Sequence, residues 1–192
     1  STDKDAVVNS LDDAITSSFI KFINQNEFKK YLDEDPSEKI EFESIALKKG
    51  KQPKNMEQSM KASVTIKTAD GHGSGFLVSN DGYILTNLHV VAGAEDLTVI
   101  TNNSKSYSAK LIRKNENKDL ALLKVDDAFE YSFNISDQKN YNIGEDIFAI
   151  STPNSIQLGQ TLSKGIISGE RISEEEKFIQ TDASVNSGNS GG

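Results

Sequence analysis

The sequence predicts a mainly β protein that is preceded by a helical segment. Between residues 6 and 34, apolar residues recur at roughly helical spacing, and neither glycine nor proline interrupts them. From about Met56 the pattern changes to short alternating segments separated by Gly, Asn and Asp, as is typical of β proteins. We therefore expect a helical N-terminal extension, residues 1–55, and a β domain, residues 56–192.

The N-terminal extension is expected to contain one or two helices. Its periodic apolar positions run from Val7 to Leu32, and the first proline is Pro36. Residues 39–47 fit a strand and a short helix equally well, whereas residues 48–53 have the Lys, Gly and Pro content of a loop.

The β domain begins with enough candidate strands to close one barrel, at about residues 60–127. They are residues 62–68, 74–79, 83–86, 96–101, 106–113 and 119–125. A partial second barrel, at about 144–192, has the candidate strands 146–151, 161–169 and 177–182. So few strands leave an open sheet with unpaired edges, and we therefore expect the second barrel to be incomplete and the sequence to be cut from a longer protein.

The last residues, G-N-S-G-G at 188–192, place a serine between glycines. A serine hydroxyl becomes a nucleophile when a base takes its proton and nearby N–H groups stabilise the charge that develops on the attacked carbonyl. Gly188 and Gly191 allow the tight turn that such a serine needs, because glycine adopts positive φ readily. Ser190 is the candidate nucleophile, although similar Gly/Ser/Asn runs are also common in ordinary turns.

A histidine and an acid precede this serine in the chain. His89 follows the strand, Asn-Asp-Gly turn and strand of residues 74–86, and imidazole titrates near neutrality, so it suits a general base. Asp119 is the first residue of the candidate strand 119–125, directly before its apolar residues. The other acids that could complete the set are Asp96, Asp126 and Asp127.

Five collinear motifs give a resemblance to a known family. They are GSGFLVSNDGYILTNLHVV, DLALLKV, GEDIFAI, GIISG, and FIQTDA leading into GNSGG, and they cover most of residues 60–192. In this order and spacing the chain resembles the trypsin-like serine proteases of the HtrA/Deg group, in the chymotrypsin clan. The resemblance implies a double six-stranded β-barrel with a catalytic triad in the cleft between the barrels.

The resemblance also implies roles for individual residues. Ser190 would be the nucleophile, His89 the base and Asp119 the acid that orients the imidazole, with the N–H groups of Gly188 and Ser190 as the oxyanion hole. Val185 matches the position at the base of the primary specificity pocket, where an apolar side chain disfavours basic substrates and favours aliphatic ones.

Composition excludes several other kinds of function. With 21 Lys and Arg against 29 Asp and Glu, the formal net charge of −8 disfavours nucleic acid as a partner. The chain has no cysteine and two histidines, so a zinc site has no plausible ligand set and we expect no metal or other cofactor. His72 and the run Glu174 to Glu176 are expected in exposed loops, the latter between strands 161–169 and 177–182. No apolar run is long enough to span a membrane.

The expected function is that of a serine endopeptidase which cleaves unfolded or misfolded polypeptides, as in protein quality control. The resemblance further implies an extracytoplasmic setting and a homo-oligomer, a trimer in many relatives. The alternative is a catalytically inactive binding or scaffold protein with the protease fold. Because the substrate surface beyond residue 192 is missing, we expect the 192-residue chain itself to be inactive.

Overall fold

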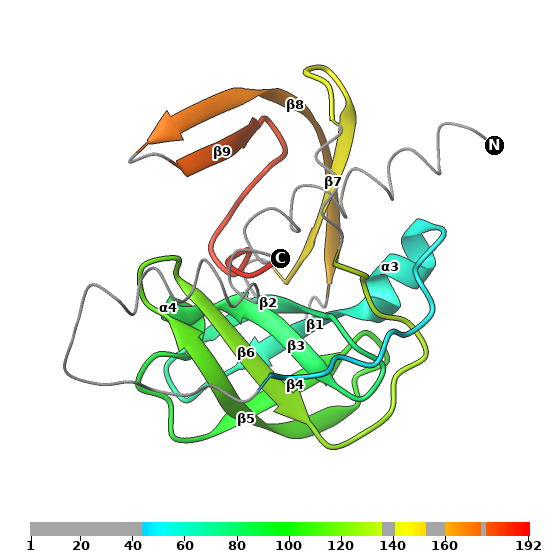
Figure 1. Cartoon of the computed structure of the whole chain (residues 1–192), viewed down its shortest axis with the longest axis vertical. Helices are drawn as coiled ribbons and strands as arrows, with labels where there is room; N and C mark the ends of the chain where they lie inside the picture. Colours follow the sequence, from blue (N-terminus) through cyan, green and yellow to red (C-terminus); the bar gives the residue numbers. More distant parts are fainter. Residues whose placement is uncertain (1–43, 136–140, 153–159, 174–175) are drawn as a thin grey trace.

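The first part of the β domain closes into a barrel of antiparallel strands (Figure 1). The computed structural model describes residues 44–135, 141–152, 160–173 and 176–192, so the helices expected between residues 6 and 34 lie outside the described residues. Around the barrel the strand order is β1–β2–β3–β6–β5–β4, and β4 pairs back with β1. The strands are β1 (Ser63–Lys67), β2 (His72–Leu77), β3 (Tyr83–Asn87), β4 (Leu97–Thr101), β5 (Ser106–Asn115) and β6 (Leu120–Val125). The predicted first barrel is therefore confirmed strand by strand.

Alternating side chains fill the interior of the barrel. Ile66, Leu77 and Leu123 are among its fully buried members, and all strands of the barrel contribute to this cluster. Neighbouring positions such as Leu122 point to the outer face, where a second buried cluster forms around Phe76 and Phe133. Strand β6 is thus buried on both faces, which explains why its sequence, LALLKV, is almost continuously apolar.

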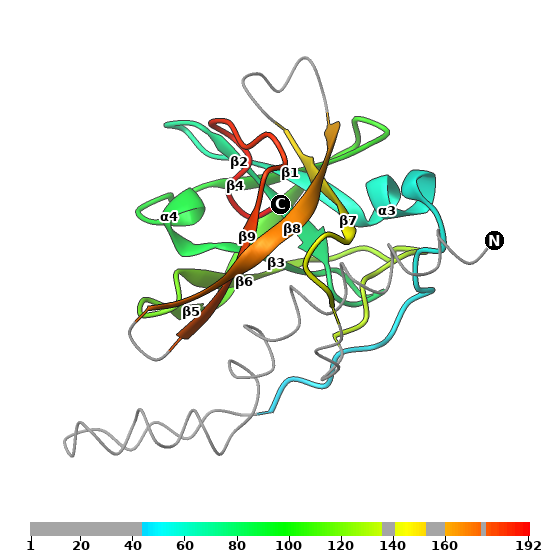
Figure 2. The ribbon, with the colours of Figure 1, turned by 90° about the horizontal axis from the view of Figure 1, so that it is seen from above.

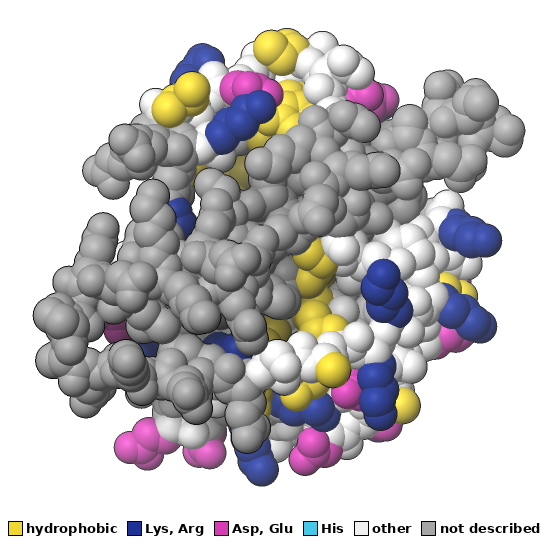
Figure 3. All heavy atoms as spheres, viewed as in Figure 1, with side chains coloured by type: hydrophobic (Ala, Val, Ile, Leu, Met, Phe, Trp, Pro, Cys, Tyr) yellow, Lys and Arg dark blue, Asp and Glu magenta, His cyan; other side chains and the backbone are white. Residues whose placement is uncertain are grey.

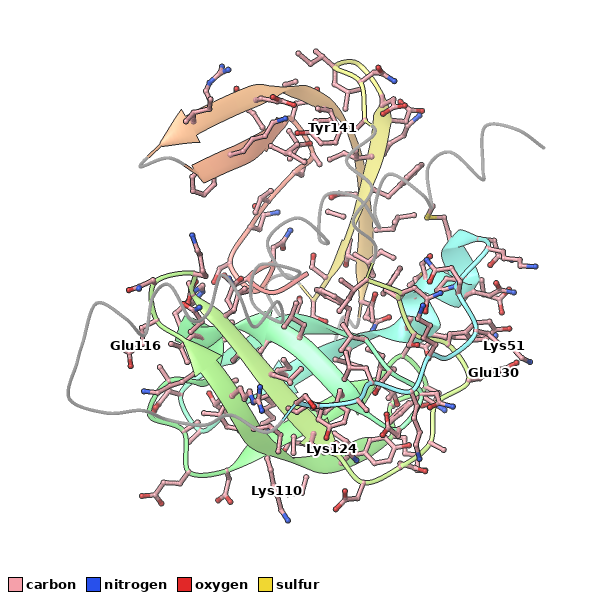
Figure 4. All side chains as sticks on the ribbon, viewed as in Figure 1. Lys51, Lys110, Glu116, Lys124, Glu130 and Tyr141 are labelled. Atoms are coloured by element: carbon pink, nitrogen blue, oxygen red, sulfur yellow. The ribbon has the colours of Figure 1, made fainter. Side chains whose placement is uncertain are left out.

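The segment that leads into the barrel covers this outer cluster. Ile45 and Leu47 pack against it, and Lys51 forms a bridge with Tyr131. The Lys51 ammonium also lies 2.9 Å from the Glu130 carboxylate, and Figure 4 shows the two side chains together beside the barrel. Residues 44–50 form neither helix nor strand, so the described part of the ambiguous segment 39–47 is a loop.

A short helix, α3 (Met56–Ala62), precedes β1. From the sequence we expect β structure from about Met56 and a first strand that begins at Ala62, and the structure corrects both. The Asn55 side chain accepts a hydrogen bond from the Gln58 N–H at 2.9 Å, which caps the first turn. Seven residues give too few turns for a clear helical period in the sequence.

The second part is a three-stranded antiparallel sheet in the order β7–β8–β9. Its strands are β7 (Asp146–Ser151), β8 (Thr161–Ser173) and β9 (Glu176–Thr181). Strand β8 continues four residues beyond the predicted end at residue 169, because it pairs with β9 as far as Ser173 and Glu176. Glu176 therefore belongs to a strand and not to the expected loop, of which residues 174–175 lie outside the described residues.

The C-terminal turn lies between the barrel and this sheet (Figure 1), and the view from above shows β8 and β9 side by side across the barrel (Figure 2). The sheet leaves the apolar side chains of Ile172 and Phe178 exposed. Figure 3 shows hydrophobic side chains, in yellow, at the surface of the upper part of the molecule. Within the described residues, none of the helices is both long and apolar enough to cross a membrane.

Candidate active site

His89 and Asp119 form a hydrogen-bonded pair at one end of the barrel. His89 lies in the single turn of helix α4 (Leu88–Val91), directly after β3, and Asp119 lies directly before β6, the neighbour of β3. The imidazole Nδ1–H donates to Asp119 Oδ2 at 2.6 Å, and the His89 backbone N–H donates to Oδ1 at 2.8 Å. Both oxygens of the Asp119 carboxylate therefore accept hydrogen bonds from His89. The His89 side chain is 58% exposed and the Asp119 side chain 44%.

This geometry determines which imidazole nitrogen carries the proton. An ionised carboxylate only accepts hydrogen bonds, so Nδ1 is the protonated nitrogen of a neutral His89. The lone pair is then on Nε2, the nitrogen that a general base uses.

The backbone of Asp119 is held in an uncommon conformation. Its φ is 51°, in the left-handed region, where Asp is better tolerated than most residues. Its carbonyl accepts two hydrogen bonds from the end of β3 and the start of α4, from Leu88 N–H at 2.9 Å and Asn87 Nδ2 at 3.0 Å. Backbone and side chain of Asp119 therefore both attach to the segment that carries His89.

The proposed nucleophile, Ser190, lies in two consecutive tight turns, residues 186–189 and 189–192, which we together call the nucleophile turn. The Asn189 N–H donates to the Asn186 carbonyl at 3.0 Å, and Gly188, in the third position, has a φ of 93°. A positive φ at this position defines a type II turn and favours glycine. In the second turn the Gly192 N–H donates to the Asn189 carbonyl at 2.9 Å.

The two N–H groups expected to form the oxyanion hole remain available. Among the hydrogen bonds of the described residues, none uses the backbone N–H of Gly188 or of Ser190. Both belong to the same turn as the Ser190 hydroxyl. The turn thus presents a hydroxyl and two backbone donors within three residues.

Ser190 is attached to the barrel next to the helix that carries His89. The Ser74 N–H on β2 donates to the Ser190 carbonyl at 2.8 Å. A Cβ built on the neighbouring Gly73 would lie 2.6 Å from Val90 Cγ1 and 3.1 Å from the Ser190 carbonyl oxygen. Val90, the residue after His89, and Ser190 therefore approach the same point of β2 from two sides.

The structure brings His89 and Asp119 into direct contact, but within the described residues no hydrogen bond joins Ser190 to His89. Nucleophile and base are often separated in this way before substrate binds. Val185, the proposed pocket residue, is 67% exposed and precedes the turn.

The other candidate acids lie elsewhere. Asp127 pairs with Lys105 at 2.9 Å, and the hydrogen bond from that ammonium lowers the pKa of Asp127 to about 2. Asp126 lies 3.3 Å from Lys124. Asp96 lies in the loop before β4, and no hydrogen bond of the described residues connects it to His89.

His72 is not in an exposed loop, as the sequence analysis expected. It is the first residue of β2, is half-buried, and its Nε2 lies 3.0 Å from the Thr152 carbonyl at the end of β7. The reason is that β2 passes under the second sheet, so its first residue is covered. Among the described residues, no three His, Asp or Glu side chains come together in a way that could hold a metal ion.

Two residues of the site were missed in the sequence analysis. Asn87 binds the Asp119 carbonyl, and the Ser74 hydroxyl donates to the Gly188 carbonyl at 2.7 Å. Gly73 and Gly75 on either side of Ser74 are the one sequence signal for the second contact, because glycine in a strand often marks the close approach of another backbone.

Comparison with known proteins identifies the family of the chain. The family model of the trypsin-like peptidase domain matches residues 73–192. A probable periplasmic serine endoprotease, DegP-like, from Hahella chejuensis is 43% identical over 128 residues, which cover 65% of this chain and 27% of the relative. One from Rickettsia prowazekii is 35% identical over 189 residues, 93% of this chain and 36% of the relative. The periplasmic pH-dependent serine endoprotease DegQ of Escherichia coli is 38% identical over 130 residues, 64% of this chain and 28% of the relative. The chain thus spans about a quarter to a third of these relatives.

Solved structures give the same result. The serine endoprotease from Yersinia pestis superimposes with a TM-score of 0.59 at 38% identity, over 70% of this chain and 49% of that chain. An HtrA-type protease, AlgW, solved with a tripeptide, superimposes with a TM-score of 0.63 at 31% identity. The match covers 70% of this chain and 47% of that chain. On the family match, the barrel and these relatives, the chain belongs to the HtrA/Deg group of trypsin-like serine proteases.

Proposed function

We propose that the protein is a serine endopeptidase in which Ser190 is the nucleophile, His89 the general base and Asp119 the residue that orients the base and stabilises its protonated form. The single observation that carries the proposal is the two-point hydrogen bonding of His89 by the Asp119 carboxylate, at 2.6 and 2.8 Å. It supports a base whose Nε2 is unprotonated and whose ring is held in one orientation.

The first half of the reaction follows from these roles. His89 Nε2 takes the Ser190 proton as the serine oxygen attacks the substrate carbonyl. The carbonyl oxygen becomes negatively charged, and the N–H groups of Gly188 and Ser190 bind it. The imidazolium is stabilised by Asp119 and gives its proton to the leaving amine, which leaves an acyl-enzyme on Ser190. Water then releases the acyl group by the same route.

We propose unfolded polypeptide as the substrate, with a small or medium aliphatic side chain in the pocket at Val185. The exposed position of Val185 and its lack of charge support this preference, because an apolar wall offers no partner to a Lys or Arg side chain. The relatives named as periplasmic endoproteases support a periplasmic setting. We propose the quality-control role on the family resemblance. We propose homotrimerisation on the family resemblance alone. We also propose an N-terminal extension over residues 1–55, whose described end packs against the barrel through Ile45 and Leu47.

The test is covalent labelling of the full-length protein by a fluorophosphonate, read by intact mass and by mapping of the modified peptide. We expect one adduct on Ser190 that is lost in Ser190→Ala and in His89→Ala. Ser187→Ala, in the same turn, and His72→Ala, at the other histidine, serve as matched controls and should retain the label.

A folded wild-type protein that takes no label would contradict the proposal, as would an adduct that persists in Ser190→Ala. If such an unreactive protein still bound unfolded polypeptide, the inactive binding or scaffold protein would be selected in its place.

A further inference from the structure

We propose that Ser74 is a positioning residue that holds the nucleophile turn in its reactive conformation; this inference rests on the proposed function of Ser190 and Gly188. Ser74 lies on β2 in the barrel, and it is 1% exposed. It is separated from Gly188 by 114 residues of sequence. Its backbone and side chain both contact the turn.

The Ser74 hydroxyl makes two hydrogen bonds. It donates to the Gly188 carbonyl at 2.7 Å and accepts from the Thr152 N–H, just beyond β7, at 2.9 Å. A serine hydroxyl has one proton, so the donation to Gly188 uses its full capacity as a donor. One buried side chain therefore connects the barrel, the second sheet and the nucleophile turn.

The Ser74 backbone makes the remaining contacts. Its N–H donates to the Ser190 carbonyl at 2.8 Å, and its carbonyl accepts from the Thr86 hydroxyl at 2.7 Å. A Cβ on Gly191 would lie 2.1 Å from that carbonyl oxygen, so the turn is packed directly on the strand. We call Ser74, Thr152, Gly188 and Ser190 the Ser74 junction.

The Ser74 hydroxyl, unlike the Ser74 backbone, fixes the peptide plane between Gly188 and Asn189. Glycine has soft dihedral angles, so the peptide planes next to Gly188 rotate easily unless something holds them. The plane between Gly188 and Asn189 is held at both ends, since its carbonyl accepts from Ser74 and its N–H donates to Asn186 at 3.0 Å. With this plane fixed, the neighbouring N–H groups of Gly188 and Ser190 keep one direction toward the oxyanion.

Thr152 connects the junction to the rest of the molecule. Its side chain is fully buried and contacts the Thr65 hydroxyl, and its carbonyl lies 3.0 Å from His72 Nε2. Loss of the Ser74 hydroxyl would leave the Gly188 carbonyl and the Thr152 N–H without these partners. Buried groups left unpaired favour local rearrangement, and the peptide planes next to Gly188 rotate more easily than those of the paired barrel strands.

The test compares Ser74→Ala with Ser79→Ala in the full-length protein. Ser79 is fully buried in the connection between β2 and β3, and its hydroxyl accepts from the Tyr83 N–H at 3.0 Å; among the described residues, no hydrogen bond joins it to the nucleophile turn. It is therefore the matched control for the loss of a buried hydroxyl. Ser74→Cys, which is close in size and has a weak S–H donor, is the conservative variant.

For Ser74→Ala we expect kcat to fall by about 10- to 100-fold while KM changes by less than about 3-fold, because the loosened oxyanion donors act mainly in the transition state. Ser74→Cys should have an intermediate kcat. Amide hydrogen exchange over residues 186–192 should speed up in Ser74→Ala and stay unchanged in Ser79→Ala.

Several results would overturn the inference. If Ser74→Ala and Ser79→Ala lose the same activity, or if exchange in the turn does not change, Ser74 has only a structural role in the barrel. A wild-type protein that hydrolyses peptides while Ser74→Ala is equally active defeats this inference alone. A wild-type protein without Ser190-dependent turnover defeats the proposed function as well.

Discussion

The barrel and the three-stranded sheet bury their apolar residues to very different extents. In the barrel Leu123 is fully buried between closed strands, whereas Ile172 on β8 is 80% exposed. Strand closure leaves no edge, so the barrel completes its own hydrogen bonding and its own core. The open sheet has few buried apolar side chains, with Ile150 and Ile167 the main ones.

This difference determines how the site is held. His89 and Asp119 both come from the barrel, at the ends of the paired strands β3 and β6, and they are already in contact. Ser190 follows the open sheet and reaches the barrel through the Ser74 junction. One part of the proposed triad is therefore held at the ends of paired barrel strands, and the other depends on a small number of contacts with β2.

Asp119→Asn tests whether the His89–Asp119 pair of the barrel serves catalysis rather than stability. Of the substitutions considered, we expect it to lower kcat the most. The amide cannot hold His89 in the same tautomer, so kcat for a peptide substrate should fall by about 10⁴-fold. The melting temperature should change little, because both side chains are substantially exposed. Turnover and thermal unfolding should be measured together, with Asp127→Asn, the partner of Lys105, as the control that keeps kcat. A small loss of kcat in Asp119→Asn would assign the orienting acid elsewhere.

Leu123→Ala and Ile172→Ala test whether the barrel is more tightly packed than the three-stranded sheet. Removal of the buried barrel side chain should cost about 2–5 kcal/mol of unfolding free energy, through lost burial and the cavity left behind. Removal of the exposed sheet side chain should stay within about 0.5 kcal/mol. Urea unfolding followed by circular dichroism gives both values. Equal costs would show that the sheet is as tightly packed as the barrel.

The sequence predicted the barrel better than the sheet, for a physical reason. Strand β1, predicted at 62–68, is observed at Ser63–Lys67, because alternating apolar residues and turn residues are local signals. The end of β8 has the sequence GERIS, which looks like a polar loop but forms a strand because β9 pairs with it. Helix α3 depends on the cap at Asn55 and is too short to show a period.

The same distinction applies to the site. His89, Asp119 and Ser190 each follow a recognisable local motif, and the contact between the first two could be expected from it. The Ser74 hydroxyl has only the flanking glycines as a signal, and they do not identify its partners Thr152 and Gly188, which are 78 and 114 residues away. Contacts of this kind depend on how the barrel and the sheet are packed, which a local pattern does not encode.

Gly191→Ala tests the packing of the turn on the barrel. Its φ is 86°, and an added Cβ would lie 2.1 Å from the Ser74 carbonyl oxygen and 2.4 Å from Thr86 Oγ1. The turn must move away, and a displacement of about 1 Å at a reacting group costs about 10²-fold in rate. The control is Gly93→Ala, where φ is 74° but a Cβ meets nothing within 4 Å.

Both substitutions place alanine at positive φ, so both carry a similar backbone strain of about 1–2 kcal/mol. Melting temperatures should therefore fall in both variants, but only Gly191→Ala should lose kcat and fluorophosphonate reactivity. If Gly93→Ala lost as much activity as Gly191→Ala, backbone strain near the site would explain the loss, and contact between the turn and β2 would not be required. A selective loss in Gly191→Ala would instead show that the reactivity of Ser190 depends on the closed barrel beneath it.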